Sequence, residues 1–324
     1  STLSPSSAAS DVYKRQSENS IQESIAQIYI QILYAAESVR VNENTLQVSI
    51  AQRDRGQELL NAGSIAKSDF AQLEAQVSTD RYQLVTAQAT LQDYKLQLKQ
   101  LLELDGENEM NIYLPALSDE NVLSPLPAKR DVYVSALALR PEIEASKLNV
   151  NASELGIDIA KSGYLPTVSL SAGIGTNHTS GSDFTFGEQV KNGWNNSIGL
   201  SVSVPIFNNR QTKSAVQKAK LQYETSMLSL LDEQKALYKT IEGLWLDANS
   251  AQQRYAAANE KLKSTQISYN LISEQFNLGM KNTVELLTEK NNLLQAQQEQ
   301  LQAKYMAILN TQLLKFYQGD KLAL

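Results

Sequence analysis

The segment SIGLSVSVPIFNNRQTKSAVQKAK, residues 197–220, changes its periodicity partway along. It begins with strict two-residue alternation, in which aliphatic side chains oppose serine and glycine, and it ends as a charged stretch typical of a helix. The alternation predicts a β-strand with one apolar face and one polar face. Pro205, at the end of the alternation, stops ladder pairing and directs the chain into the helix that follows.

A second segment, YLPTVSLSAGIGTN at residues 164–177, has the same alternation. A loop rich in Gly, Ser and Asn, residues 176–194, separates the two segments, and together they predict a β-hairpin within residues 163–207. Each strand has about 10 residues, the length that a tilted strand needs to cross a bilayer. The side chains expected to face lipid lie on the apolar face of the two strands: Val168, Leu170, Ala172, Ile174, Ile198, Leu200, Val202 and Val204.

The rest of the chain is predicted to be mainly helical. Two long helical hairpins flank the strands, at residues 17–104 and 208–318. A connector and a shorter helix broken near Pro141 occupy residues 105–162, and residues 319–324 form a tail. In the second hairpin, apolar residues alternate in steps of four and three, and this period of about 3.5 residues predicts coiled-coil packing.

The first hairpin has a similar apolar seam, with Asp80 as its single lapse in the second helix. Its turn, LLNAGSIAKSDF, predicts an N-cap at Ser64 or Ser68. The turn of the second hairpin, QFNLGMKNTVEL, aligns with it at a constant offset of 216 residues, so that Gly63 matches Gly279. The same offset relates residues of the preceding helices, which indicates an internal duplication.

Composition excludes several classes of function. The chain of 324 residues has no cysteine, which rules out thiol catalysis, disulfides and Cys-based zinc sites. The net charge of −6 gives no basic stripe for nucleic acid. His178, the one histidine, lies in the loop between the strands without acidic neighbours at ligand spacing, and we predict neither a metal site nor a cofactor. No catalytic constellation is visible, and we do not expect an enzyme.

The first 16 residues need separate treatment. The stretch SSAASDVYKRQ, residues 6–16, resembles a translated sequencing-library adapter. We therefore expect residues 1–16 to be an adapter-derived leader. The internal repeat also indicates that the natural chain begins earlier. The long helix that starts near residue 208 would have a counterpart that starts before Ser17, and a first pair of strands would precede that counterpart.

Over residues 17–318 the sequence resembles the TolC family of outer membrane efflux proteins. The likeness is carried by LRPEIEASKLNVNASELGIDIAKSGYLPTVSLSAGIG, by SIGLSVSVPIFNNRQTKSAVQKAKLQYE, and by the two glycine turns. It implies a mainly α fold with a β-hairpin, in which a long helical coiled-coil tunnel joins transmembrane β-barrel strands and a homotrimer completes both. This chain holds two of the four strands that a family subunit contributes.

The resemblance also assigns roles to the two turns. It implies that the tips contact a periplasmic adaptor, whereas a helical hairpin also favours a C-cap glycine for purely structural reasons. The tip residues are Gly63, Ser64, Ile65, Gly279, Met280 and Lys281. Asp69 and Glu285 fall where the family places acidic residues near the tunnel entrance, and Glu285 would form a threefold carboxylate ring. Stabilisation of a helix N-terminus is an equal alternative for both carboxylates.

The function implied is that of an outer membrane channel-tunnel subunit in a tripartite efflux or type I export system of a Gram-negative bacterium. Its partners would be two further copies of itself, a periplasmic adaptor protein, an inner membrane transporter and outer membrane lipid. Transport would be passive within this protein, and the sequence does not specify the cargo. The alternatives are a periplasmic adaptor, which should contain a lipoyl-like β-domain, and a soluble coiled-coil scaffold, which leaves the bilayer-length strands unexplained.

Overall fold

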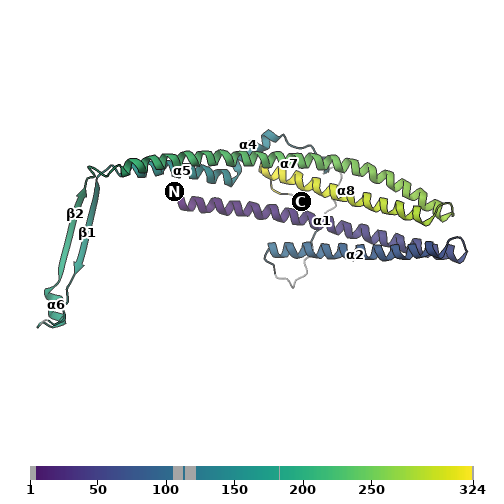
Figure 1. Ribbon diagram of the computed structural model, residues 1–324, viewed down its shortest axis with the longest axis horizontal. Coiled ribbons are helices and arrows are strands. Elements are labelled where there is room, and N and C mark those ends of the chain that lie inside the picture. The colour runs from purple at the N-terminus through teal and green to yellow at the C-terminus, as the bar shows by residue number, and fades with distance from the viewer. Residues whose placement is uncertain (1–4, 105–111, 114–121, 182, 323–324) are drawn as a thin grey trace. The chain divides into compact units, whose positions relative to one another are not determined.

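The computed structural model describes residues 5–104, 112–113, 122–181 and 183–322. Within these ranges the chain is mainly helical and contains a two-stranded sheet (Figure 1). It divides into two compact units. One unit comprises residues up to 144 and from 234 onward, and the other comprises residues 145–233.

The first unit is built from long helices that form two antiparallel hairpins (Figure 1). Its helices are α1 (Pro5–Asn61), α2 (Lys67–Leu101), α4 (Lys129–Leu139), the part of α7 (Gln211–Asn277) from residue 234 onward, and α8 (Thr283–Gln318). One hairpin pairs α1 with α2, the other pairs α7 with α8, and α8 also packs along α1. Both predicted hairpins are confirmed.

Apolar residues at heptad-like spacing form the core where the hairpins meet. Ile30 and Leu33 of α1 pack against Leu301 and Tyr305 of α8, and Tyr255 of α7 joins the same cluster. Each of these five side chains is at most 8% exposed. The narrow apolar stripe of each helix therefore faces its neighbours, as coiled-coil packing requires.

Asp80, the predicted lapse in the seam of α2, is buried in an ion pair. One carboxylate oxygen, Oδ2, accepts hydrogen bonds from Lys290 Nζ of α8 and from Ser49 Oγ of α1. The other, Oδ1, accepts a hydrogen bond from Gln76 Nε2 at 2.9 Å. Asp80 and Lys290 are 2% and 3% exposed. Burial lowers the pKa of Lys290, and the adjacent Asp80 carboxylate opposes that effect. The polar lapse thus ties three helices from both hairpins together.

Arg140 holds the junction after α4. Its guanidinium lies 3.5 Å from the ring centroid of Tyr317 in α8 and 3.3 Å from Glu23 of α1. Burial raises the pKa of Glu23, and the charge of Arg140 opposes that shift. Arg140 has extended backbone, and α5 (Pro141–Ser162) begins at the next residue. The break predicted at Pro141 is confirmed, because proline suits the first turn of a helix.

The second unit contains the strands. β1 (Thr167–Gly175) and β2 (Asn195–Ser203) pair antiparallel, and α6 (Phe186–Asn192) lies in the connection between them. The first part of α7 is anchored to α5 by a hydrogen bond of 2.8 Å between the hydroxyls of Ser226 and Ser153.

Two expectations from the sequence are wrong in detail. The N-cap of α2 is Ala66, neither Ser64 nor Ser68, because helical geometry begins at Lys67. The connection at residues 176–194 was expected to be a loop but contains α6, whose N-cap Thr185 exchanges hydrogen bonds with Glu188.

The helix α1 runs without a break through residues 5–16 and thus begins before the predicted boundary at residue 17. The interpretation of residues 1–16 as adapter-derived stays a prediction. Among the described helices, none is long and apolar enough to cross a membrane.

The buried ion pair yields a stability prediction. Asp80→Ala leaves Lys290 buried without its counter-charge, so we expect a loss of about 3 kcal/mol or more in unfolding free energy. The double variant Asp80→Leu/Lys290→Leu removes both charges and should recover most of that loss. Thermal unfolding followed by circular dichroism compares the two variants. Equal destabilisation in both would show that packing volume, rather than the unpaired charge, determines the effect.

Candidate functional site: an amphipathic β-hairpin and two helical tips

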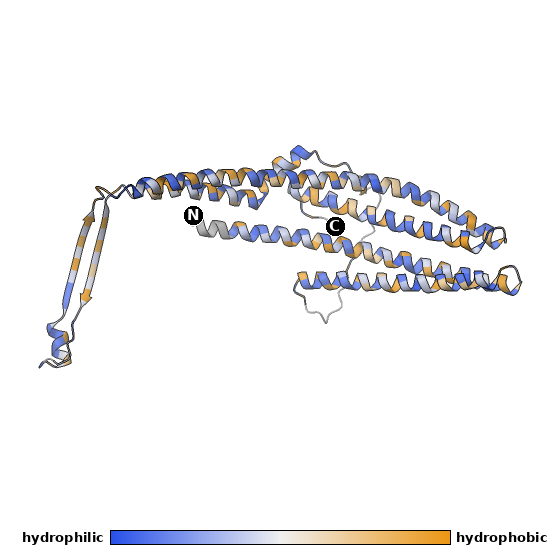
Figure 2. Cartoon of the chain, viewed as in Figure 1, coloured by the Kyte–Doolittle hydropathy of each residue, from blue (hydrophilic) through white to orange (hydrophobic). Residues whose placement is uncertain are grey.

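The register of the two strands places like side chains opposite one another. Val168 pairs with Val202 and Leu170 with Leu200, while Ser169 pairs with Ser201. Since directly paired residues point to the same side of a sheet, the aliphatic side chains of both strands share one face and the serines and glycines share the other. Figure 2 shows the alternating colours along both strands.

The apolar face of the hairpin is uncovered in the single chain. The predicted lipid-facing side chains all count as exposed, with Leu170 at 75% and Ile198 at 83%. Val204 lies one residue beyond the end of β2. Tyr164 and Trp194, which flank the strands, are also more than half exposed. Within the described residues each strand has one partner, so each keeps an edge of unpaired backbone groups.

The two helical tips share one backbone geometry. Gly63 has φ of +71° and Gly279 has φ of +75°, both in the left-handed region. Each glycine and the residue after it donate a matching pair of backbone hydrogen bonds to the end of the preceding helix. The second bond of each pair runs from Ser64 N–H to Leu59 C=O at 2.8 Å and from Met280 N–H to Gln275 C=O at 2.8 Å. All these residues match at the offset of 216, so the structure repeats the duplication seen in the sequence.

The predicted entrance carboxylates both bind the start of a helix. Asp69 accepts a hydrogen bond from the Ala66 N–H at 3.4 Å, and Glu285 accepts one from the Asn282 N–H at 3.2 Å. Glu285 also forms an ion pair with Lys281 at 2.5 Å. The hydrogen bond from Lys281 is the main reason why the pKa of Glu285 is lowered, and the Asn282 N–H adds to it. The capping alternative is therefore realised for both residues within one chain.

His178, the one histidine of the sequence, makes local packing contacts in the connection between the strands. His178 lies beside Gln189, with Nδ1 3.0 Å from its side-chain oxygen, and its ring meets Phe186 edge to face at 5.3 Å. No group of three or more potential metal ligands exists in the part of the chain that the structure describes. The histidine thus packs the loop around α6.

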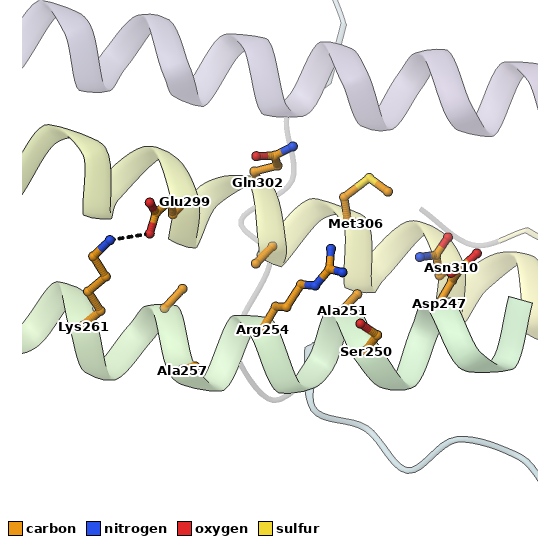
Figure 3. Close-up of a pocket in the computed structure, with 12 residues that line it drawn as sticks. Asp247, Ser250, Ala251, Arg254, Ala257, Lys261, Glu299, Gln302, Met306 and Asn310 are labelled. Carbon is orange, nitrogen blue, oxygen red and sulfur yellow. Dashed lines mark hydrogen bonds and ion pairs between the residues drawn. The ribbon is translucent and has the colours of Figure 1, made fainter.

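A cavity between α7 and α8 was not foreseen from the sequence. It has a volume of about 580 Å³ and is lined by alanines, by Met306 and by charged side chains (Figure 3). Lys261 of α7 and Glu299 of α8 form an ion pair of 2.7 Å at one end, and the hydrogen bond from Lys261 lowers the pKa of Glu299. Arg254 extends from α7 toward α8 (Figure 3) and has no ionic partner among the described residues.

Three comparisons place the chain among known proteins. A family model described as outer membrane efflux protein matches residues 132–319. The outer membrane efflux protein BepC of Brucella suis biovar 1 (strain 1330) is 24% identical over 298 residues, 91% of this chain and 62% of the relative. The outer membrane protein TolC of Escherichia coli K12 is 25% identical over 313 residues, 93% of this chain and 61% of the relative. A structure of CusC, from work on transmembrane channel formation, matches with a TM-score of 0.81 at 19% identity, covering 97% of this chain and 71% of that one.

The family model covers more than half of the sequence, so this chain belongs to the outer membrane efflux protein family. The likeness to CusC shows that the chain shares the fold of that protein. The chain spans about three fifths of the length of the curated relatives it matches.

The tip geometry predicts which substitutions Gly63 tolerates. A Cβ atom added there would meet nothing within 4 Å, so the cost comes from the backbone conformation alone. We expect Gly63→Val to destabilise the turn by about 1–2 kcal/mol, and Gly63→Asn to cost much less because asparagine adopts left-handed backbone more readily. Amide hydrogen exchange at Ser64 measures the difference. Equal protection in both variants would contradict a conformational requirement for glycine.

Proposed function

We propose that the protein is a subunit of an outer membrane channel-tunnel, through which an export system passes its substrates. One observation carries the proposal: the register-matched β-hairpin, whose aliphatic side chains all lie on one exposed face. Such a face is stable when it meets hydrocarbon, and strands of nine residues, as in β1 and β2, match the membrane-spanning length of tilted strands.

The strand edges require partners. In lipid every backbone N–H and C=O must be paired, so a two-stranded hairpin can persist only inside a closed barrel. Further copies of the protein supply the missing strands, and the family resemblance indicates a homotrimer. The face that carries Ser169 and Ser201 then lines the lumen, while the face that carries Leu170 and Leu200 contacts the outer membrane lipid.

The helices continue the conduit into the periplasm. Their two matching tips project beyond the last core residues and meet a periplasmic adaptor, which links the channel to an inner membrane transporter. Met280, at 70% exposure, offers an apolar contact there. Transport in this protein is passive and needs neither a cofactor nor a catalytic group. In the trimer Glu285 of each subunit both caps its helix and adds to a carboxylate ring at the entrance.

Matched charge insertions test the membrane assignment. Leu170→Arg places a charge on the apolar face and should cost about 2–4 kcal/mol near the bilayer midplane, so the variant should be lost from the outer membrane fraction. Ser169→Arg places the same charge on the opposite face and should be retained as heat-resistant oligomers. Membrane fractionation measures the location of each variant, and gel electrophoresis with and without heating measures whether it forms heat-resistant oligomers. If the two variants partition alike, the strands do not contact lipid, and a helical scaffold or adaptor becomes the better explanation.

A further inference from the structure

Two linkers join the strands to the helices of the second unit. Residues 163–166 connect α5 to β1, and residues 204–210 connect β2 to α7. Thr212, in the first turn of α7, is buried between the linkers. Its Oγ1 donates a hydrogen bond to the Gly163 carbonyl at 3.3 Å and accepts one from Asn208 Nδ2. Both linkers are therefore held together at the end of the hairpin where α7 begins.

The linkers carry large apolar side chains that the described chain leaves uncovered. Ile206 and Phe207 are 96% and 83% exposed, and Tyr164 and Leu165 of the other linker are 55% and 63% exposed. These four residues, here called the apolar collar, all lie within four residues of a strand end. The collar thus extends the apolar surface of the hairpin by one layer toward the helices. Aromatic side chains such as these are favoured where the hydrocarbon of a bilayer gives way to the head groups.

A basic segment begins directly beyond the apolar collar. It comprises the exposed residues Arg210, Lys213, Lys218 and Lys220. Between Phe207 and Glu224 the sequence contains no acidic residue. At the end of α5, Asp158 already forms an ion pair with Lys161 at 2.8 Å. None of the four cations of the basic segment has an ionic partner among the residues that the structure describes, so their charge is available to an external anion.

Arg210 holds its charge at a conformational cost. Its φ is +62° and that of Asn209 is +50°, both in the left-handed region. Asparagine adopts this conformation readily, whereas arginine is strained there and glycine would be relaxed. The helical tips use glycine for the same conformation, at Gly63 and Gly279. A charged side chain retained in strained backbone favours a use for that charge.

The opposite end of the hairpin has a different charge pattern. Its connection, residues 176–194, contains Asp183, Glu188 and Lys191, which gives two negative charges, one positive charge and a net charge of −1. The unpaired positive charge thus lies at the end of the hairpin that leads into the helices. Because anionic lipid attracts lysine and arginine next to a membrane surface, this asymmetry distinguishes the two leaflets.

We infer that the apolar collar and the basic segment bind anionic phospholipid in the periplasmic leaflet of the outer membrane. The acyl chains lie on the aliphatic face of the strands and on the collar, and the phosphate lies among the cations, where the guanidinium of Arg210 can donate two hydrogen bonds to it. The adjoining apolar surface favours a lipid over a soluble anion. The inference rests on the proposed membrane-spanning hairpin and deepens it by specifying the charge of the lipid and the end of the hairpin that binds it.

Native mass spectrometry of the purified full chain in detergent tests this inference. The probes are phosphatidylglycerol, which is anionic, and phosphatidylethanolamine, which has no net charge, added in equal amounts. The unmodified protein should retain more phosphatidylglycerol. Lys213→Gln should weaken phosphatidylglycerol binding about fivefold, as expected for one cation beside anionic lipid, and leave phosphatidylethanolamine binding unchanged. Lys191→Gln, which removes an exposed lysine at the opposite end of the hairpin, is the matched control and should change neither.

Arg210→Gly separates the charge from folding. Glycine relieves the left-handed strain, so thermal stability should be equal or higher, while phosphatidylglycerol binding should fall about fivefold. Together with Lys213→Gln the loss should be about thirtyfold. Equal retention of both lipids by the unmodified protein, or unchanged phosphatidylglycerol binding in the double variant, would overturn the inference. So would displacement of the lipid by inorganic phosphate when sodium chloride of equal ionic strength leaves it bound.

The two proposals can fail separately. A preference for phosphatidylglycerol that depends on Arg210 and Lys213, in a protein that stays out of the outer membrane, would support the lipid-binding surface and contradict the channel. Heat-resistant oligomers in the outer membrane that retain both lipids equally would support the channel and contradict this surface.

Discussion

The structure depends on the match between strand period and strand register. Side chains alternate every two residues, and the pairing of Leu170 with Leu200 brings the aliphatic sets of both strands to one face. A shift of one residue would mix the faces and leave serines among the aliphatic side chains. Nothing in the described part of the chain covers that face, so its stability requires an apolar environment and further strands that pair with the open edges.

Elements were predictable from the sequence where they depend on a short repeat of apolar side chains or on one unusual backbone dihedral angle. The strands follow from alternation, the long helices from heptad spacing, and the tips from glycines such as Gly63, whose positive φ only a few residue types adopt readily. The helix α6 was missed because it has only seven residues, although Thr185 and Glu188 hold the spacing of a capping box. The cavity between α7 and α8 was missed because its lining comes from two facing helices, at residues 247–261 and 299–310, and only the fold of the hairpin brings these residues together.

The duplication leaves equivalent residues in different surroundings. Each hairpin repeats the same tip, whereas the contact in which α8 of one hairpin packs on α1 of the other occurs once among the described residues. The α1–α8 contact buries Leu301, while Val85, the repeat counterpart of Leu301, is exposed at the surface. The apolar residues Val85 of α2 and Leu246 of α7 therefore stay exposed within one chain, although their counterparts Leu301 and Ile30 are buried.

The Asp80–Lys290 pair departs from this repetition, because the counterpart of Asp80 is the buried Ala296 and the counterpart of Lys290 is the exposed Glu74. The two hairpins are consequently not interchangeable. An exchange of one for the other during assembly would bury a carboxylate opposite alanine and leave it uncompensated, which is costly in a dry interior. A single pair of charges therefore gives each of two otherwise similar hairpins its own place in the helical unit.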